Sequence, residues 1–448
     1  MKKYDVIIVG AGPAGIFAAL ELSKVDGIKA LIIDKGSDIE QRVLEVPRSL
    51  LCGWGGAGAF SDGKLTLSPE VGGQLASYLP DGEVDRLIRY VDQIYVDFGA
   101  PKKVYGTNED DINRIAREAI LADLKLVPSA IRHVGTEQWP KMLRKLHEAI
   151  EKHVDIRMET AVSEILTREG RAVGIETAEG ETIEGNYVII APGREGADWL
   201  LEEARRLDLE SMNNPVDVGV RVELPAPVLE GLTDALYEPK LIFYSPSFDD
   251  KVRSFCVCPY GEVVMEYNDT VTTVNGHSYA AKKTNNTNFA LLVSTMFTEP
   301  FREPITYGRY IASLSNLLSG SVIVQRLGDL KAGRRSTWSR IEHGLVEPTL
   351  KTATPGDLSF VLPYRYLAGI TEMIEAMDKL APGVASRHTL LYGVEVKFYS
   401  SRLRLTPSLE TDIANLFTVG DGAGVTRGLI QASASGVIAA REIIKRSS

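Results

Sequence analysis

The sequence predicts an α/β protein in which both ends of the chain build one doubly wound layer and a strand-rich segment interrupts it. Residues 4–33 follow the order strand, glycine-rich turn, helix, strand. Residues 416–444 repeat the order strand, glycine-rich turn, helix near the other end. Residues 213–382, in contrast, are broken by prolines and contain few long helical patterns. The expected domains are therefore interleaved.

Composition limits the classes of function. A chain of 448 residues with 44% hydrophobic content is long enough for two or three lobes and too apolar for wholesale disorder. Its net charge of -10 argues against a nucleic-acid partner, because phosphate backbones require a basic face. Three cysteines are too few for a disulfide framework, and no apolar run approaches the roughly 18 residues of a membrane span. We expect a cytoplasmic protein without stable membrane association.

Periodicity predicts the elements in order. Strands are expected at 4–9 and 29–33, and amphipathic helices at 83–98, 107–119 and 136–153. Residues 155–190 alternate as a three-stranded β-meander with turns near 169–170 and 179–180. Further helices are expected at 198–207, 305–318, 364–380 and 429–444, and a strand at 416–419.

The strongest motif is GAGPAG at residues 10–15, which fits the pattern G-x-G-x-x-G. It follows a predicted strand, opens a helix and is followed by Asp34 at the end of the second strand. Gly10 permits a tight turn, Gly12 lets a diphosphate approach the backbone, and Gly15 lets helix and strand pack closely. Helix-start amides attract the diphosphate, and Asp34 can accept hydrogen bonds from a ribose. The alternative is a glycine-rich turn followed by an incidental acid.

Two further glycine clusters are expected near the same ligand. Residues 53–58 (GWGGAG) match the pattern without a preceding strand, and we interpret them as a loop against the cofactor, with a plain surface loop as the alternative. Residues 420–424 (GDGAG) lie between a predicted strand and a predicted helix, so a second helix start points into the layer. Asp421 is a good acceptor for hydroxyl groups. The two ends of the chain are therefore expected to converge on one dinucleotide.

These segments resemble the two-dinucleotide-binding-domain flavoproteins of the glutathione reductase and p-hydroxybenzoate hydroxylase type. The matching pieces are VIIVGAGPAGIFAALEL with Asp34, YVIIAPG at 187–193 and NLFTVGDGAGVTRGLIQASASGVIAA at 415–440. The resemblance implies that the first motif binds the ADP half of FAD and that Gly420 and Asp421 hold the diphosphate and ribityl part. Residues 52–65 (CGWGGAGAFSDGKL), with the terminal segment, look like FAD-dependent dehydrogenases of unknown substrate.

The implied fold is a Rossmann-like FAD-binding domain with a β-meander, plus a mixed α+β substrate or cap domain inserted in it. The expected boundaries are 1–73, 136–212 and 385–448 for the FAD-binding domain, 74–135 for a helical insertion and 213–384 for the substrate domain. The expected FAD contacts are Gly10, Gly12, Pro13, Ala14, Gly15, Asp34, Lys35, Arg42, Gly55, Gly56, Ala57, Ser61, Asp62, Gly63, Val162, Ala191, Pro192, Gly193, Gly420, Asp421, Thr426, Gly428 and Leu429.

The cysteines depart from the disulfide reductases, because the sequence lacks their C-x-x-C and their second nicotinamide-binding unit. Cys256 and Cys258 lie one residue apart in a predicted strand, so alternation puts both on one face, too close in sequence for an easy disulfide. We interpret them as buried structural cysteines. Cys52 lies at the head of the glycine loop, where a place near the flavin and a packing role are both open.

Substrate contacts are less determined by the pattern. His277 lies in a polar segment at 274–292 and is a candidate proton donor, with a surface histidine as the alternative. Arg334, next to Arg335, is a candidate clamp for a carboxylate or phosphate, with a solvated arginine as the alternative. No histidine or cysteine spacing indicates a metal site.

The favoured function is an FAD-dependent oxidoreductase that transfers two electrons between flavin and a small organic substrate. Without a nicotinamide domain, the electron donor is expected to be transiently bound NAD(P)H, a redox carrier protein or the substrate itself. A flavin monooxygenase or a prenyl reductase is the enzymatic alternative, and a flavin-binding redox sensor or scaffold is the non-catalytic one. A tRNA-modifying flavoenzyme is a further idea that the acidic composition weakens.

Overall fold

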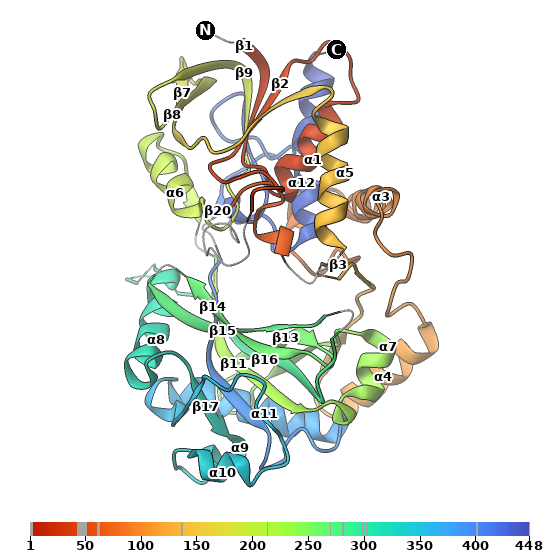
Figure 1. The fold of residues 1–448 in the computed structure, drawn as a ribbon, viewed down its shortest axis with the longest axis vertical. Coiled ribbons are helices and arrows are strands. Elements are labelled where there is room, and N and C mark those ends of the chain that lie inside the picture. Colours follow the sequence, from red (N-terminus) through yellow and green to blue (C-terminus); the bar gives the residue numbers. More distant parts are fainter. Residues whose placement is uncertain are drawn as a thin grey trace. The chain divides into compact units, whose positions relative to one another are not determined.

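The chain forms two compact units (Figure 1). A computed structural model describes residues 3–42, 52–60, 63–135, 138–212, 214–268, 270–279, 282–297, 300–301, 303–399 and 402–447. Unit 1 comprises Met1–Lys103, Arg132–Asn214 and Tyr399–Ser448, and unit 2 comprises Val104–Ile131 and Pro215–Phe398. None of the helices in the described ranges combines the length and the apolar composition that a membrane crossing requires.

Unit 1 is built on a mixed sheet in the order β6-β2-β1-β9-β8-β7, with β21 also paired to β9. Its strands are β1 (Lys3–Val9), β2 (Ala30–Ile33), β6 (Val154–Arg157), β7 (Val162–Arg168), β8 (Arg171–Thr177), β9 (Thr182–Ile190) and β21 (Leu416–Thr418). The first residues of β9 pair with β8 in an antiparallel meander, and its last residues pair in parallel with β1 and β21. The single strand β9 therefore joins the meander to the parallel layer.

Helices cover this parallel layer. They are α1 (Pro13–Leu22), α3 (Glu83–Asp97), α5 (Trp139–Ile150), α6 (Ala197–Arg206) and α12 (Leu429–Ser447). Shorter elements of the same unit are η1 (Gly56–Phe60), η2 (Leu75–Ser77), η5 (Asp421–Ala423), β3 (Lys64–Thr66), β10 (Ser211–Met212) and β20 (Arg402–Leu403), and β5 (Ile131–His133) pairs with β3.

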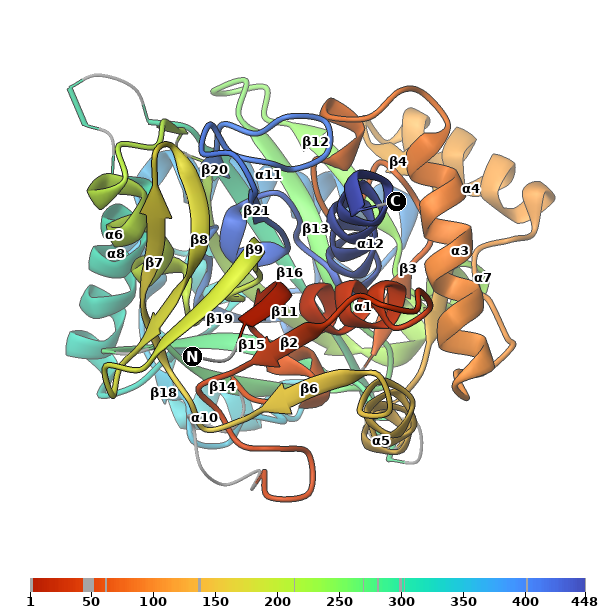
Figure 2. The ribbon, with the colours of Figure 1, turned by 90° about the horizontal axis from the view of Figure 1, so that it is seen from above.

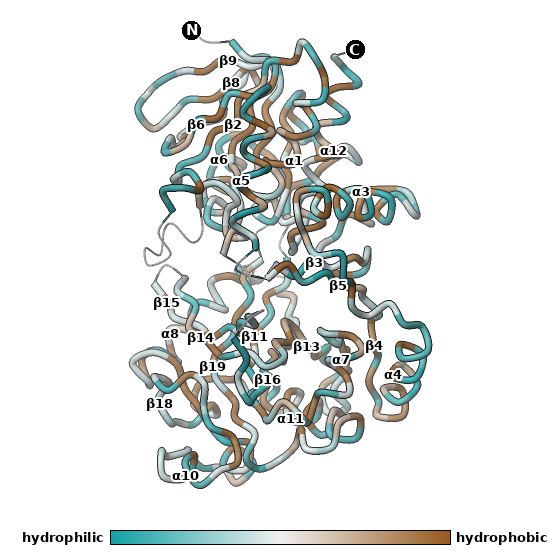
Figure 3. Tube along the Cα trace, turned by 45° about the vertical axis from the view of Figure 1, so that its right-hand side comes forward, coloured by the Kyte–Doolittle hydropathy of each residue, from teal (hydrophilic) through white to brown (hydrophobic). Residues whose placement is uncertain are grey.

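Helices α1 and α12, from opposite ends of the chain, lie side by side (Figure 2). A Cβ atom on Gly436 of α12 would lie 1.9 Å from the backbone oxygen of Ala14 in α1, so only glycine permits this approach. Hydrophobic residues run along β2 and α1 in the core of unit 1 (Figure 3). This packing brings the start of α1 next to the turn that precedes α12.

Unit 2 contains a larger sheet in the order β18-β17-β19-β11-β16-β13-β12-β4. These strands are β4 (Lys125–Val127), β11 (Val216–Pro225), β12 (Lys240–Tyr244), β13 (Lys251–Cys258), β16 (Asn286–Thr295), β17 (Ile323–Arg326), β18 (Thr354–Pro355) and β19 (Leu390–Lys397). A separate hairpin consists of β14 (Glu262–Asn268) and β15 (Val271–His277). The helices of unit 2 are α4 (Glu109–Leu121), α7 (Glu230–Leu236), α8 (Pro304–Ser319), α9 (Leu327–Lys331), α10 (Trp338–Glu342) and α11 (Tyr364–Leu380). Two short 3-10 helices, η3 (Ala226–Val228) and η4 (Leu358–Phe360), belong to the same unit.

The two faces of the unit 2 sheet differ in polarity. In β11, Val218, Val220 and Val222 belong to the hydrophobic cluster that includes α11. The intervening residues Asp217 and Arg221 are charged and fully or almost fully buried. Because side chains alternate along a strand, β11 directs one apolar row and one charged row to opposite faces.

The structure confirms the predicted α/β class and most predicted elements, and its division into two units differs from the expected domains at two places. The expected helical insertion at 74–135 is divided, since 74–103 belong to unit 1 and 104–131 to unit 2. The cause is long-range pairing, because β4 hydrogen-bonds to β12 while α3 packs against α12. The expected boundary at 384 moves to 398, because β19 pairs with β11 and β17 in the sheet of unit 2.

Candidate cofactor site

The turn between β1 and α1 uses its three glycines for two different purposes. A Cβ atom on Gly10 would lie 2.0 Å from the oxygen of Ala191, and one on Gly15 would lie 1.9 Å from the oxygen of Gly10. Gly12, at the start of α1, has an ordinary φ of -78°, and no described atom lies within 4 Å of the Cβ position. Gly10 and Gly15 therefore permit packing, whereas Gly12, at a helix start, has room for a ligand among the described residues.

The turn that precedes α12 meets this first turn. A Cβ atom on Gly420 would lie 3.1 Å from the Cβ of Ala14, and one on Gly422 would lie 2.2 Å from the oxygen of Gly193. Gly420 has a φ of +79°, a conformation that favours glycine. The expected convergence of the two ends of the chain is thus present within unit 1.

The second glycine loop lies against both helix starts. The amide of Gly55 donates to the oxygen of Ala11 at 2.8 Å, and a Cβ atom on Gly56 would lie 3.1 Å from Gly12 Cα. On Gly58, a Cβ atom would lie 2.7 Å from Leu429 Cδ2 and 3.5 Å from Cγ of Pro13. This loop, which includes Ala57 in η1, therefore touches the starts of α1 and α12.

Arg42 holds the glycine loop at residues 53–58 through hydrogen bonds to its backbone. Its Nη1 donates to the oxygens of Trp54 at 2.7 Å and Gly56 at 3.0 Å. Burial lowers the pKa of the Arg42 guanidinium to about 10, which leaves it protonated at neutral pH. Its observed contacts hold the loop backbone in place.

Asp34 connects three parts of the site. Its carboxylate accepts hydrogen bonds from the amides of Ala11 and Gly36 at 2.8 Å and of Gly53 at 2.9 Å. A carboxylate offers about four acceptor positions, so Asp34 retains capacity for one more donor such as a ribose hydroxyl. The backbone oxygen of Asp34 accepts a hydrogen bond from the amide of Thr160 at 2.9 Å. Thr160 lies two residues before Val162, the first residue of β7. Sequence analysis anticipated a ligand contact here but not this organising role.

The start of α12 has its own supports. Thr426 Oγ1 donates to Asp421 Oδ1 at 2.6 Å, and the amide of Arg427 donates to the oxygen of Gly72 at 2.8 Å. Gln431 Nε2 donates to the oxygens of Pro69 at 3.2 Å and Val71 at 3.0 Å. Gln431 is almost completely buried and was missed from sequence, although a glutamine in the apolar run LIQASASGVIAA is a visible signal.

The remaining predicted contacts fall into three groups. Ala191, Pro192 and Gly193 follow β9, and no described atom lies within 4 Å of the Cβ position on Gly193. Gly63 packs against Val134, Gly428 lies near Gly72, and the exposed Lys35 forms an ion pair with Glu195 at 3.4 Å. Ser61 and Asp62 lie outside the described residues.

The two substrate residues predicted in unit 2 have separate surroundings. His277 ends β15 and stacks on Tyr279, with 6.4 Å between ring centroids. Arg334 is 53% exposed, and its Nε lies 2.9 Å from Oδ1 of the buried Asp329. His277 therefore contacts Tyr279, and Arg334 contacts Asp329.

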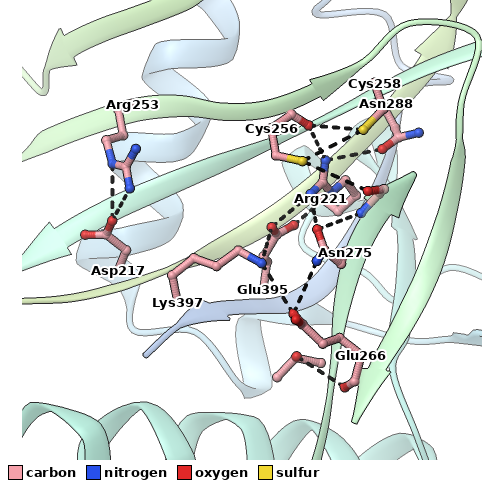
Figure 4. A network of polar contacts seen from close by, with 12 residues as sticks. Asp217, Arg221, Arg253, Cys256, Cys258, Glu266, Asn275, Asn288, Glu395 and Lys397 are labelled. Carbon is pink, nitrogen blue, oxygen red and sulfur yellow. Dashed lines mark hydrogen bonds and ion pairs between the residues drawn. The ribbon is translucent and has the colours of Figure 1, made fainter. Parts of the chain in front are cut away.

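Unit 2 also holds a buried polar network that sequence analysis missed (Figure 4). Arg221 makes two hydrogen bonds to Glu395, at 2.8 and 2.9 Å, and both side chains are fully buried. Lys397 Nζ lies 3.1 Å from Glu395 and 3.4 Å from Glu266. Burial alone would lower the pKa of Lys397, but these two carboxylates raise it above its ordinary value. Alternation of valine and charge in VDVGVRVEL was the available signal, and it is equally typical of a solvent-exposed strand face.

Comparison with known proteins identifies the class. Residues 3–49 match a family model described as an FAD binding domain, and residues 215–398 match one described as FAD-dependent protein, C-terminal domain-like. The second match coincides with the long segment of unit 2. The chain is thus a flavoprotein with FAD as its cofactor. Neither description names a reaction or a substrate.

Individual relatives are distant or cover short segments. An uncharacterized protein of Clostridium beijerinckii is 28% identical over an alignment that covers 99% of this chain and 81% of that protein. Digeranylgeranylglycerophospholipid reductase 3 of Methanosphaera stadtmanae is 62% identical over 39 residues, which are 9% of this chain and 10% of that protein. Among solved structures, L-proline dehydrogenase from P. horikoshii matches with a TM-score of 0.44 and 12% identity, over 99% of this chain and 94% of that chain.

Proposed function

We propose that unit 1 holds FAD on the convergent turns and that the enzyme is a dehydrogenase or reductase acting on a small organic substrate. One observation carries the cofactor site. No described atom lies within 4 Å of the Cβ positions on Gly12 and Gly193, whereas protein atoms occupy the Cβ positions on neighbouring glycines such as Gly10, Gly15 and Gly422. A diphosphate binds at a helix start whose backbone amides are not covered by side chains. The glycines on the other side of the turn let the helix and the strand pack closely.

The chain's own residues position the cofactor. The start of α1 presents amides and the positive end of its dipole to the diphosphate, and Asp34 accepts from the ribose. Asp421 and the start of α12 hold the ribityl and pyrimidine side, and the loop at 55–57 limits solvent access to both helix starts. Bound FAD supplies two-electron transfer, and the protein supplies orientation and electrostatics.

In unit 2, His277 remains our candidate for proton transfer to the substrate, because it is half-buried and an imidazole ring can both donate and accept a hydrogen bond. Arg334 is the weaker candidate. Its ion pair with the buried Asp329 gives it a structural partner, so substrate binding by Arg334 would have to break that contact.

A prenyl reductase is the second candidate. The local 62% identity to the digeranylgeranylglycerophospholipid reductase of Methanosphaera stadtmanae favours it, although the match spans only 39 residues. Saturation of an isoprenoid chain by the reduced enzyme would support this alternative over a dehydrogenase of small polar metabolites.

The test is anaerobic reduction of the purified, FAD-loaded protein by NADH, NADPH and a panel of metabolites and isoprenoid lipids, followed by loss of flavin absorbance. We expect one donor to bleach the flavin rapidly and saturably. Repetition in air tests the monooxygenase alternative, in which a hydroxylated product appears. If only dithionite bleaches the flavin, and photoreduction changes the oligomeric state, the non-catalytic sensor replaces the enzyme.

A further inference from the structure

The two cysteines of β13 are brought together by a distortion of the strand. The register of β13 against β16 shifts between Phe255 and Cys258, and Cys256 has a φ of +46°. A β-bulge of this kind adds a residue and re-aims side chains, and a positive φ is uncommon for a residue other than glycine. The sulfur atoms of Cys256 and Cys258 lie 3.9 Å apart as a result. In a regular strand, as expected from the sequence, the spacing of the two cysteines disfavours a disulfide. The bulge changes that geometry.

The two thiols differ in exposure. Cys258 is fully buried, whereas Cys256 is partly exposed. This corrects the expectation that both cysteines are buried. An accessible thiol paired with a buried one is the arrangement in which the first attacks an external disulfide and the second resolves the product.

A fixed positive charge lies beside the pair. Arg221 Nη1 donates to the backbone oxygen of Cys256 at 2.7 Å, and Glu395 holds the same guanidinium (Figure 4). A Cβ atom on Gly276 would lie 2.8 Å from Arg221 Nη1, so this glycine lets the hairpin close over the guanidinium. These contacts fix the backbone of Cys256, whose thiolate is the nucleophile in disulfide exchange.

We propose that Cys256 and Cys258 form a redox-active dithiol that closes to an intramolecular disulfide by exchange with a low-molecular-weight disulfide such as glutathione disulfide. The Cys256 thiolate attacks one sulfur of glutathione disulfide, which forms a mixed disulfide and releases one glutathione thiolate. The Cys258 thiolate then attacks the Cys256 sulfur, breaks the mixed disulfide and releases the second glutathione. The protein loses two electrons and two protons, and one glutathione disulfide becomes two glutathione molecules.

The geometry makes closure a local change. A disulfide needs a sulfur–sulfur distance of about 2.05 Å, so side-chain rotation must shorten the 3.9 Å separation by about half. The bulge has already bent the intervening backbone. Because the step uses an external disulfide, it does not depend on the proposed flavin chemistry.

The experiment equilibrates the full-length holoprotein with glutathione and glutathione disulfide at graded ratios, followed by acid quenching, unfolding, maleimide labelling and mass spectrometry. The chain has three cysteines, and the reduced protein should therefore carry three labels. The oxidised protein should carry one label, at Cys52, and no glutathione. In urea, the same change should require a ratio of glutathione disulfide to glutathione that is about tenfold higher or more, because unfolding separates the two thiols.

Two variants sharpen the result. Cys258→Ser should retain one glutathione on Cys256, because the resolving thiol is gone, whereas Cys52→Ser should cycle like the wild type. The proposal is overturned if the folded wild type keeps three labels at every ratio, or if it retains glutathione as Cys258→Ser does. Repetition with FAD-free protein separates this outcome from any failure of the flavin proposal.

Discussion

Unit 1 and unit 2 place their polar groups in opposite ways. The candidate site of unit 1 depends mainly on backbone, with glycine turns at both helix starts and no described atom within 4 Å of the Cβ position on Gly12. The polar centre of unit 2 consists of side chains, with Arg221, Glu395 and Lys397 buried together on one sheet face. The contrast teaches that an added Cβ atom is the damaging change in unit 1, whereas loss of a charge is the damaging change in unit 2.

The largest effect on stability is expected from Glu395→Ala in unit 2. This change leaves Arg221 and Lys397 without their shared carboxylate, and breaking a buried ion pair costs about 3–5 kcal/mol. Denaturant unfolding followed by a probe in unit 2 measures the loss. Glu347→Ala removes an exposed pair with Lys351 in the same unit and should leave unfolding unchanged. Equal effects of the two variants would contradict the contrast.

Gly15→Ala should destabilise unit 1 by about 1–3 kcal/mol, because its Cβ atom would lie 1.9 Å from the oxygen of Gly10 and the turn must shift. Gly12→Ala is the matched control. Its φ suits any residue and no described atom lies within 4 Å of the new Cβ, so its thermal unfolding without FAD should equal that of the wild type. A Gly12→Ala protein as unstable as Gly15→Ala would show that Gly12 has a packing role.

Glu21 should contribute a smaller, pH-dependent stabilisation of about 1.5 kcal/mol to unit 1. Burial would raise its pKa, but hydrogen bonds from Lys24, Tyr90 and Arg441 lower it below its usual 4.5. The advantage of the wild type over Glu21→Gln should be complete above pH 4.5 and disappear as the pH falls through the lower folded-state pKa. Unfolding free energies between pH 3 and 7 measure this, and a difference that grows on acidification would refute it.

Arg334→Ala is expected to have the smallest effect, a loss of about 1 kcal/mol, because Asp329 keeps contacts with Ser336 and Arg326. Catalytic rate and substrate affinity should stay close to wild type if Arg334 only supports Asp329. Steady-state kinetics with the donor found by the reduction screen provide the measurement. A large rise in KM, rescued by lysine, would instead assign Arg334 to substrate binding.

The same contrast explains what the sequence could predict. Gly10, Gly12, Gly15 and Asp34 are visible because a turn, a helix start and a strand end lie close together along the chain. Arg221 and Glu395 are 174 residues apart, and nothing local indicates that they meet. The division of residues 74–135 likewise depends on β4 pairing with β12. The bulge at Cys256 was also hidden, because a strand-forming sequence does not reveal where its register shifts.

Flavin content of Gly12→Val tests the central claim most directly. The claim is that the space beside Gly12 belongs to the diphosphate of FAD, so the added isopropyl group should remove bound flavin without damaging the protein. We predict a wild type with flavin absorbance and a colourless Gly12→Val protein whose circular dichroism and unfolding match those of FAD-free wild type. A Gly12→Val protein that retains stoichiometric FAD, or a wild type that binds none when FAD is added, would contradict the account.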